Sequence, residues 1–207
     1  MIVFIPTQDE ATQDNMAVAG HIALPANRLH GPNAIRANAI HALTAAPIAP
    51  FFAISHGNPD SLLGHDEEPA VTTGDRELFG ERNSFAFACH TAKGIGPSVA
   101  EQGGIWFGFA GPINCLPADP DTIHHFISIV DFIEDRFPGC TTTADASAFI
   151  NDLKQLTDQA FAIIDESGEQ SFEVLHALRD IAMRLRIWLP FADNPVKHIE
   201  AFGDPVL

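Results

Sequence analysis

Positive charge is scarce in this chain. Its 207 residues include 11 lysines and arginines against 27 aspartates and glutamates, and the formal net charge is -16 at pH 7. Proteins that bind nucleic acid need a basic face to neutralise phosphates, so the composition argues against a nucleic-acid partner. The negative charge favours solubility and could attract basic partners.

Long apolar runs and cysteines are also few. No apolar stretch approaches the roughly 20 residues that cross a bilayer, so we expect no membrane association. The apolar start, residues 1–6, is too short for a signal peptide and lacks its basic residues. Three cysteines do not make a disulfide framework. We therefore expect a cytoplasmic protein in which Cys89 stays a free thiol.

The order of apolar blocks predicts an α/β fold. Four short blocks begin at Ile2, Phe51, Phe85 and Ile105, and each has the continuous apolar character of a buried parallel strand. We expect one mainly parallel sheet flanked by helices. No linker divides the chain, so residues 1–207 are predicted to form a single domain, with a sheet-containing core in 1–118 and a mainly helical part in 119–207.

Helical periodicity dominates after residue 119. Apolar residues spaced by three or four predict helices over about 123–137 and 145–165, and a third from residue 171 through Trp188. Residues 7–15 are polar and are predicted to be loop. Residues 58–83 are predicted to form a long loop rich in acids and turn residues.

Two of the strand blocks end in reactive side chains. Phe51 to Ser55 leads into His56-Gly57, and Ser84 to Ala88 leads into Cys89. Ligands of open α/β sheets bind just past the carboxyl ends of the strands. If the two strands are neighbours, imidazole and thiol meet in one cleft, which is the minimum apparatus of a cysteine nucleophile.

These motifs resemble the caspase-like cysteine peptidases, a group that includes caspases, metacaspases, gingipains, separases and bacterial CHAT-domain proteases. His56-Gly57 matches the family's His-Gly, Ala88-Cys89 its Ala-Cys, and Cys89-His90-Thr91 is close to the Cys-His-Ser of metacaspases. A further apolar strand block follows soon after the cysteine, at residues 104–110. This order of elements is most similar to that of CHAT domains. The resemblance covers about residues 50–111 and implies a three-layer caspase-like fold.

The resemblance also implies an activity. It makes the protein a cysteine endopeptidase, a thiol protease that acts on protein or peptide substrates without a cofactor. Cys89 would attack the substrate carbonyl, and His56 would activate the thiol or protonate the leaving amine. The backbone N–H groups of Gly57 and Cys89 would form the oxyanion hole, which contributes about 3–4 kcal/mol per donor. Whether a regulatory protein partner, a ligand or cleavage activates the enzyme is left open.

Acidic residues after His56 suggest a substrate preference. Relatives such as metacaspases, gingipains and separases cleave after basic residues by using acidic pockets, and an acidic loop could line such a pocket here. The four acids concerned are Asp60, Asp66, Glu67 and Glu68. The alternative is that they form a solvated loop face. Only two basic residues, Lys93 and Arg82, lie near enough to the motifs in the sequence to bind an aspartate of the substrate. Their scarcity favours basic over acidic substrates.

Two other functions remain open from the sequence. The first is a catalytically inactive caspase-like module that binds or regulates. The second is a metal-dependent hydrolase that uses His56, His65, Cys89 and His90, although their spacing is not that of known zinc sites. The expected state is without metal, with His90 and His65 as loop or packing residues. Cys115 and Cys140 are predicted to be core or loop cysteines.

Overall fold

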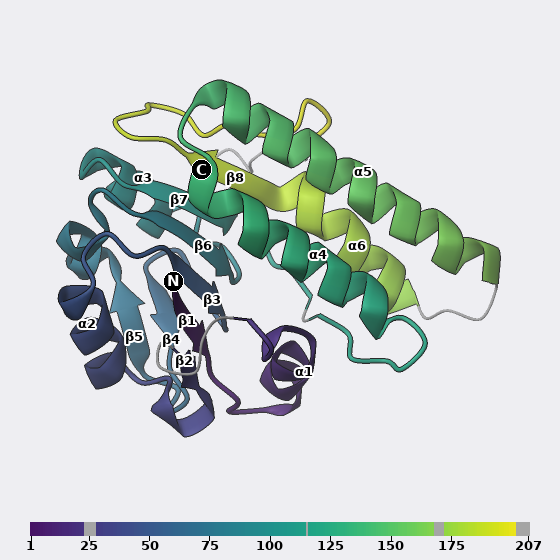
Figure 1. The fold of residues 1–207 in the computed structure, drawn as a ribbon, viewed down its shortest axis with the longest axis horizontal. Coiled ribbons are helices and arrows are strands. Elements are labelled where there is room, and N and C mark those ends of the chain that lie inside the picture. The colour runs from purple at the N-terminus through teal and green to yellow at the C-terminus, as the bar shows by residue number, and fades with distance from the viewer. Residues whose placement is uncertain (23–27, 115, 168–171, 202–207) are drawn as a thin grey trace.

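A mostly parallel six-stranded sheet forms the centre of the molecule (Figure 1). The structure is a computed structural model that describes residues 1–22, 28–114, 116–167 and 172–201. The strand order is β2-β1-β3-β6-β7-β8, and only β8 runs antiparallel to its neighbour. The strands are β1 (Ile2–Ile5), β2 (Arg28–His30), β3 (Phe51–Ile54), β6 (Asn83–Phe87), β7 (Ile105–Phe109) and β8 (Leu185–Trp188).

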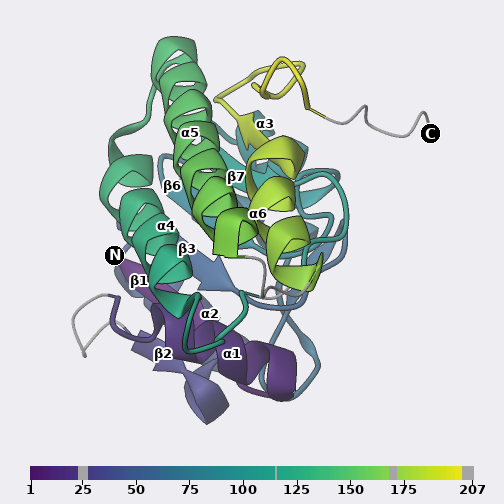
Figure 2. The ribbon, with the colours of Figure 1, turned by 90° about the vertical axis from the view of Figure 1, so that its right-hand side faces the viewer.

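Helices cover both faces of the sheet, which gives three layers (Figures 1 and 2). One face packs against α1 (Glu10–Ala19), α4 (Ile123–Arg136), α5 (Thr143–Ser167) and α6 (Phe172–Arg184). The other packs against α2 (Arg36–Ala45), α3 (Ile95–Glu101), the hairpin of β4 (Ser61–Leu63) and β5 (Pro69–Thr72), and the 3-10 helix η3 (Thr73–Phe79). Short 3-10 turns η2 (Gly31–Asn33) and η4 (Phe137–Gly139) complete the chain.

The continuous apolar runs are explained by burial on both faces. Side chains alternate across a strand, so Phe52 and Ile54 enter the core under α4–α6 while Phe51 and Ala53 enter the core under α2 and α3. All four are fully buried or nearly so. The predicted mainly parallel α/β fold is confirmed, as is the prediction that the four apolar blocks are neighbouring strands, in the order β1-β3-β6-β7.

Three local predictions are wrong. Residues 10–19 form helix α1 because the Asp9 carboxylate accepts from the Thr12 N–H and starts the helix with a capping box. Residues 185–188 leave the helical pattern and pair with β7 as strand β8, since Leu185 and Ile187 are buried against the sheet. The predicted long loop after His56 contains the β4–β5 hairpin and η3.

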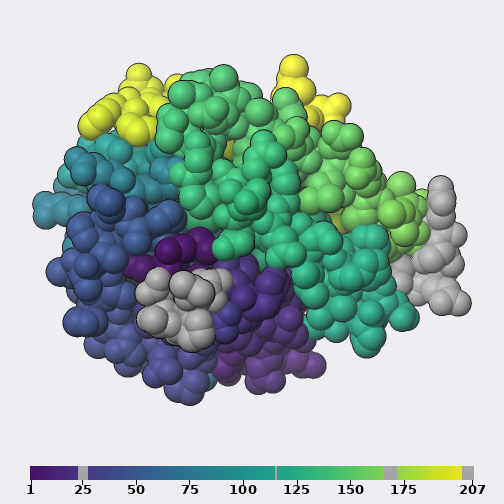
Figure 3. All heavy atoms as spheres, viewed as in Figure 1, coloured from purple at the N-terminus to yellow at the C-terminus, as the bar shows by residue number. Residues whose placement is uncertain are grey.

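The C-terminal helices and the N-terminal strands pack directly against each other. In the space-filling view, the green surface of α4 and α5 meets the purple and blue surface of the N-terminal part along a continuous boundary (Figure 3). Within the described ranges, no helix combines the length and the apolar character that a membrane span requires.

Candidate active site

The carboxyl ends of β3 and β6 create the site. These strands are hydrogen-bonded neighbours in parallel register, with Ile54 opposite Phe87, and the Ser55 N–H continues the pairing by donating to the Phe87 carbonyl at 3.1 Å. His56 and Cys89 each follow two residues after the end of their strand. The two chains therefore leave the sheet side by side at the same edge.

His56 and Cys89 line one pocket of about 210 Å³. Its other walls come from helix α1, the strand ends and the segment after β7. The residues that line it with them are Ala11, Asn15, Ser55, Phe87, Ile113 and Asn114. The structure therefore brings the two sequence-predicted reactive side chains to one cavity, and the other described residues that line it carry no charged side chain.

The Cys89 thiol is half-buried and is held by the segment after β7. Its Sγ accepts from the Ile113 N–H at 3.4 Å and can donate to the Ile113 carbonyl at 3.5 Å. These two contacts hold the sulfur against the backbone of Ile113. The chain turns at once after the cysteine, because His90 adopts φ 62° and its N–H donates to the Gly111 carbonyl.

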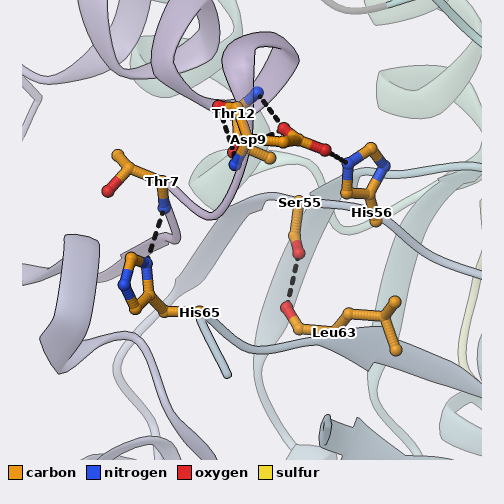
Figure 4. Close-up of polar contacts among 7 residues, drawn as sticks. All are labelled: Thr7, Asp9, Thr12, Ser55, His56, Leu63 and His65. Carbon is orange, nitrogen blue, oxygen red and sulfur yellow. Dashed lines mark hydrogen bonds and ion pairs between the residues drawn. The ribbon is translucent and has the colours of Figure 1, made fainter. Parts of the chain in front are cut away.

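His56 is hydrogen-bonded by an acidic residue from the N-terminal helix (Figure 4). Its Nε2 lies 2.6 Å from Oδ2 of Asp9, the residue that caps α1. The other Asp9 oxygen accepts from the N–H and the hydroxyl of Thr12, at 2.9 and 2.8 Å. The sequence does not predict Asp9 as a site residue, although the pattern Asp-x-x-Thr before residues 13–19 signals the start of a helix.

The Asp9 carboxyl is set up to stay ionised. Partial burial raises its pKa, but hydrogen bonds from Thr12 and His56 together lower it more, so the net pKa lies below the ordinary value. The side chains of His56 and Asp9 are 42% and 47% exposed, so solvent screens their attraction. The pair matters more for orienting the imidazole than for stability.

The role of Gly57 and Cys89 as oxyanion donors stays a prediction. Among the described residues, no acceptor within hydrogen-bond distance is found for the N–H of Gly57 or of Cys89. Gly57 lies close to the turn that carries Cys89, because a Cβ at this position would lie 2.9 Å from the Ala88 Cβ and 3.1 Å from the Cys89 carbonyl oxygen. Only glycine permits this approach of the two strand ends.

The four predicted specificity acids are exposed but lie in two separate places. Asp60 lies beside the turn before α3, where its carboxylate is 2.9 Å from the position of a Cβ on Gly94. Asp66, Glu67 and Glu68 form the turn of the β4–β5 hairpin, and this turn is held by the bond from the His65 N–H to the Ala34 carbonyl. None of the four is among the described residues that line the pocket.

Comparisons with known proteins identify no relative. No family model, curated protein or solved structure matches this chain significantly. The caspase-like resemblance rests on the motifs alone and stays a prediction.

The remaining histidines and cysteines have other surroundings. His65 Nδ1 accepts from the Thr7 N–H at 3.4 Å, while burial, with the charges of Lys93 and Arg184, lowers the pKa of His90. Over the described ranges, no three histidine, cysteine, aspartate or glutamate residues are grouped as a metal site would need. Cys140 is buried, as predicted for a core cysteine, and burial together with the Asp145 charge raises its pKa to about 11. Cys115 lies outside the described residues.

Proposed function

We propose that this protein is a cysteine endopeptidase that uses Cys89 as nucleophile and His56 as general acid and base. The observation that carries the proposal is the shared pocket: both side chains line it, from the carboxyl ends of adjacent parallel strands. A thiol beside an imidazole is the arrangement that cysteine catalysis needs. The proposed setting is a reducing compartment such as the cytoplasm, which would keep the thiol free.

The proposed reaction has two halves. His56 takes the Cys89 proton, and the thiolate sulfur forms a bond to the carbonyl carbon of the scissile peptide. The resulting oxyanion is bound by the N–H groups of Gly57 and Cys89. When the carbon–nitrogen bond breaks, His56 gives its proton to the leaving amine, and an acyl-enzyme thioester remains. Water then attacks that thioester while His56 takes a water proton, and the carboxylic acid and the thiol are released.

Two backbone features support this chemistry. The Gly57 and Cys89 N–H groups have no partner among the described residues, so they are free to bind an oxyanion. The Ile113 N–H donates to the Cys89 sulfur at 3.4 Å and would hold the nucleophile in place before attack. Of the described residues that line the pocket, His56 and Cys89 are the ones with ionisable side chains.

A mutant series tests the proposal with a fluorescent peptide library and denatured casein as substrates. Cys89→Ala should abolish hydrolysis without loss of fold, because alanine fits where a small, half-buried cysteine did. His56→Ala should lower kcat/KM by about 10²–10⁴-fold. Cys140→Ala is the matched control and should retain activity, since Cys140 is buried away from the pocket. Full hydrolysis by Cys89→Ala would overturn the assignment.

A binding module without catalysis is the second candidate. The observation in its favour is that, among the described residues, the Cys89 sulfur is hydrogen-bonded to the Ile113 backbone and not to His56. Iodoacetamide labelling separates the two functions. A catalytic Cys89 should be labelled much faster than a free thiol model at pH 6–7, and labelling no faster than the model would favour the binding module.

A further inference from the structure

We infer that Asp9 is the positioning residue of this site: it holds the His56 imidazole in the orientation and the tautomer that the Cys89 thiol requires. The inference rests on the proposed function and adds a third member to the pair. Asp9 comes from the start of α1, 47 residues before His56. In this role Asp9 acts on the imidazole of His56 and not on the substrate.

The hydrogen bond to Asp9 holds the His56 imidazole at its Nε2 edge. The Asp9 carboxylate is 2.6 Å from Nε2 of His56, so this nitrogen carries the proton and donates it to the carboxylate. The basic nitrogen is then Nδ1, which makes no hydrogen bond to another residue of the described ranges. Nδ1 is thereby left for the thiol proton and later for the leaving amine.

The carboxylate itself has little freedom to move. Its second oxygen accepts two hydrogen bonds from Thr12, and the Asp9 N–H donates to the Thr12 hydroxyl at 3.0 Å. Helix α1 is in turn fastened to the segment after β7, because the buried Asn15 side chain accepts from the Leu116 N–H at 2.9 Å. Figure 4 shows Asp9 held between Thr12 and the His56 ring.

The charges around His56 agree with this role. Asp9, at the start of α1, is hydrogen-bonded to the ring, and Cys89, on the turn after β6, lines the same pocket as His56, whereas the other described residues that line this pocket are uncharged. Once the thiol proton moves to His56, the ring becomes cationic, and a fixed anion at Nε2 stabilises it. Asp9 would therefore stabilise the imidazolium that forms during the proposed reaction.

The decisive variant is Asp9→Asn, which keeps the shape and the helix-capping ability of the residue but removes its charge. We expect kcat/KM to fall about 10–100-fold, mainly through kcat. The pH profile of Cys89 labelling by iodoacetamide should shift to higher pH, while the melting temperature stays close to that of the parent. Asp9→Glu, which keeps the charge, should restore part of the activity and of the labelling profile.

The matched control is Asp131→Asn. Asp131 makes a histidine–aspartate pair of the same 2.6 Å length with His21, which follows the C-terminal end of α1, and both partners are exposed. This variant should leave activity and labelling unchanged. If Asp9→Asn behaves like Asp131→Asn while His56→Ala still shifts the labelling profile, the inference fails and the proposed function stands. If His56→Ala also leaves the profile unchanged, the proposed pair itself fails.

Discussion

Arg82 shows how one buried side chain can hold a layer together. It is almost fully buried, and burial lowers its pKa to about 10. Its guanidinium donates to the Leu43 and Ala49 carbonyls at 2.9 and 3.0 Å, at and just beyond the C-terminal end of α2. It also lies 5.7 Å from the ring centre of Phe79. This residue, which directly precedes β6, therefore joins the start of the strand to the helix layer.

Arg82→Met should destabilise the fold strongly. Methionine keeps the apolar stem but leaves two carbonyls without a donor, so we expect the free energy of unfolding to fall by about 2–4 kcal/mol. Urea denaturation followed by circular dichroism measures it. Arg76→Met is the control: Arg76 is exposed and lies 3.7 Å from Glu101, and such a surface pair contributes about 0–1 kcal/mol. An equal fall in the free energy of unfolding in the two variants would contradict the structural role assigned to Arg82.

The reactive pair could be predicted from sequence because its signal is local. His56 and Cys89 each stand at the end of an apolar run, and strand ends of a parallel sheet share one edge. Asp9 could not be predicted, since its link to His56 spans 47 residues and depends on where α1 packs. The hydrogen bonds of Ile113 to the sulfur depend in the same way on the path after β7.

Strand β8 is the element whose sequence misleads most. Its residues continue the three-and-four spacing of α6, so periodicity predicts one helix through Trp188. Pairing with β7 overrides this preference, because it buries Leu185 and Ile187 and lets Trp188 donate to the Ala92 carbonyl at 2.8 Å. The parallel strands were predictable because burial on both faces leaves an unbroken apolar run.

The acids before and within the β4–β5 hairpin supply a test of substrate preference at the scale of one element. If the acids select substrates, neutralising Asp60, Asp66, Glu67 and Glu68 one at a time to the amide should lower kcat/KM for peptides with Arg or Lys before the cut, with one position dominating. Asp60 is the best placed, because it adjoins the turn that follows Cys89. Peptides with a neutral residue before the cut are the control.

Because the described residues that line the pocket beside His56 and Cys89 are uncharged, the opposite substrate preference must also be tested. A library profile that prefers an apolar or acidic residue before the scissile bond would rule out the basic preference and leave the pair of Cys89 and His56 untouched. Small changes at all four positions, removed by salt, would mean that the acids are only a solvated surface.

The whole molecule carries a formal net charge of -16, which should act on encounter with substrate. For a peptide with a lysine-rich extension beyond the cleaved segment, we expect kcat/KM to fall several-fold between 20 and 200 mM salt, because screening weakens long-range attraction. The same peptide with a glycine and serine extension is the control and should respond little. Equal salt dependence of both peptides would show that the surface charge does not steer substrates.

Gly57 has a consequence for how this site can be studied genetically. Any side chain there would collide with the turn that carries Cys89, so a library selected for folding alone would retain glycine at codon 57. Intolerance to mutation is therefore expected even if the Gly57 N–H has no role in catalysis. Semisynthesis with glycolic acid at position 57 separates the steric requirement for glycine from a catalytic role of the N–H. The resulting ester removes the N–H and adds no bulk. Slower turnover by a well-folded ester protein would assign a catalytic role to the hydrogen itself.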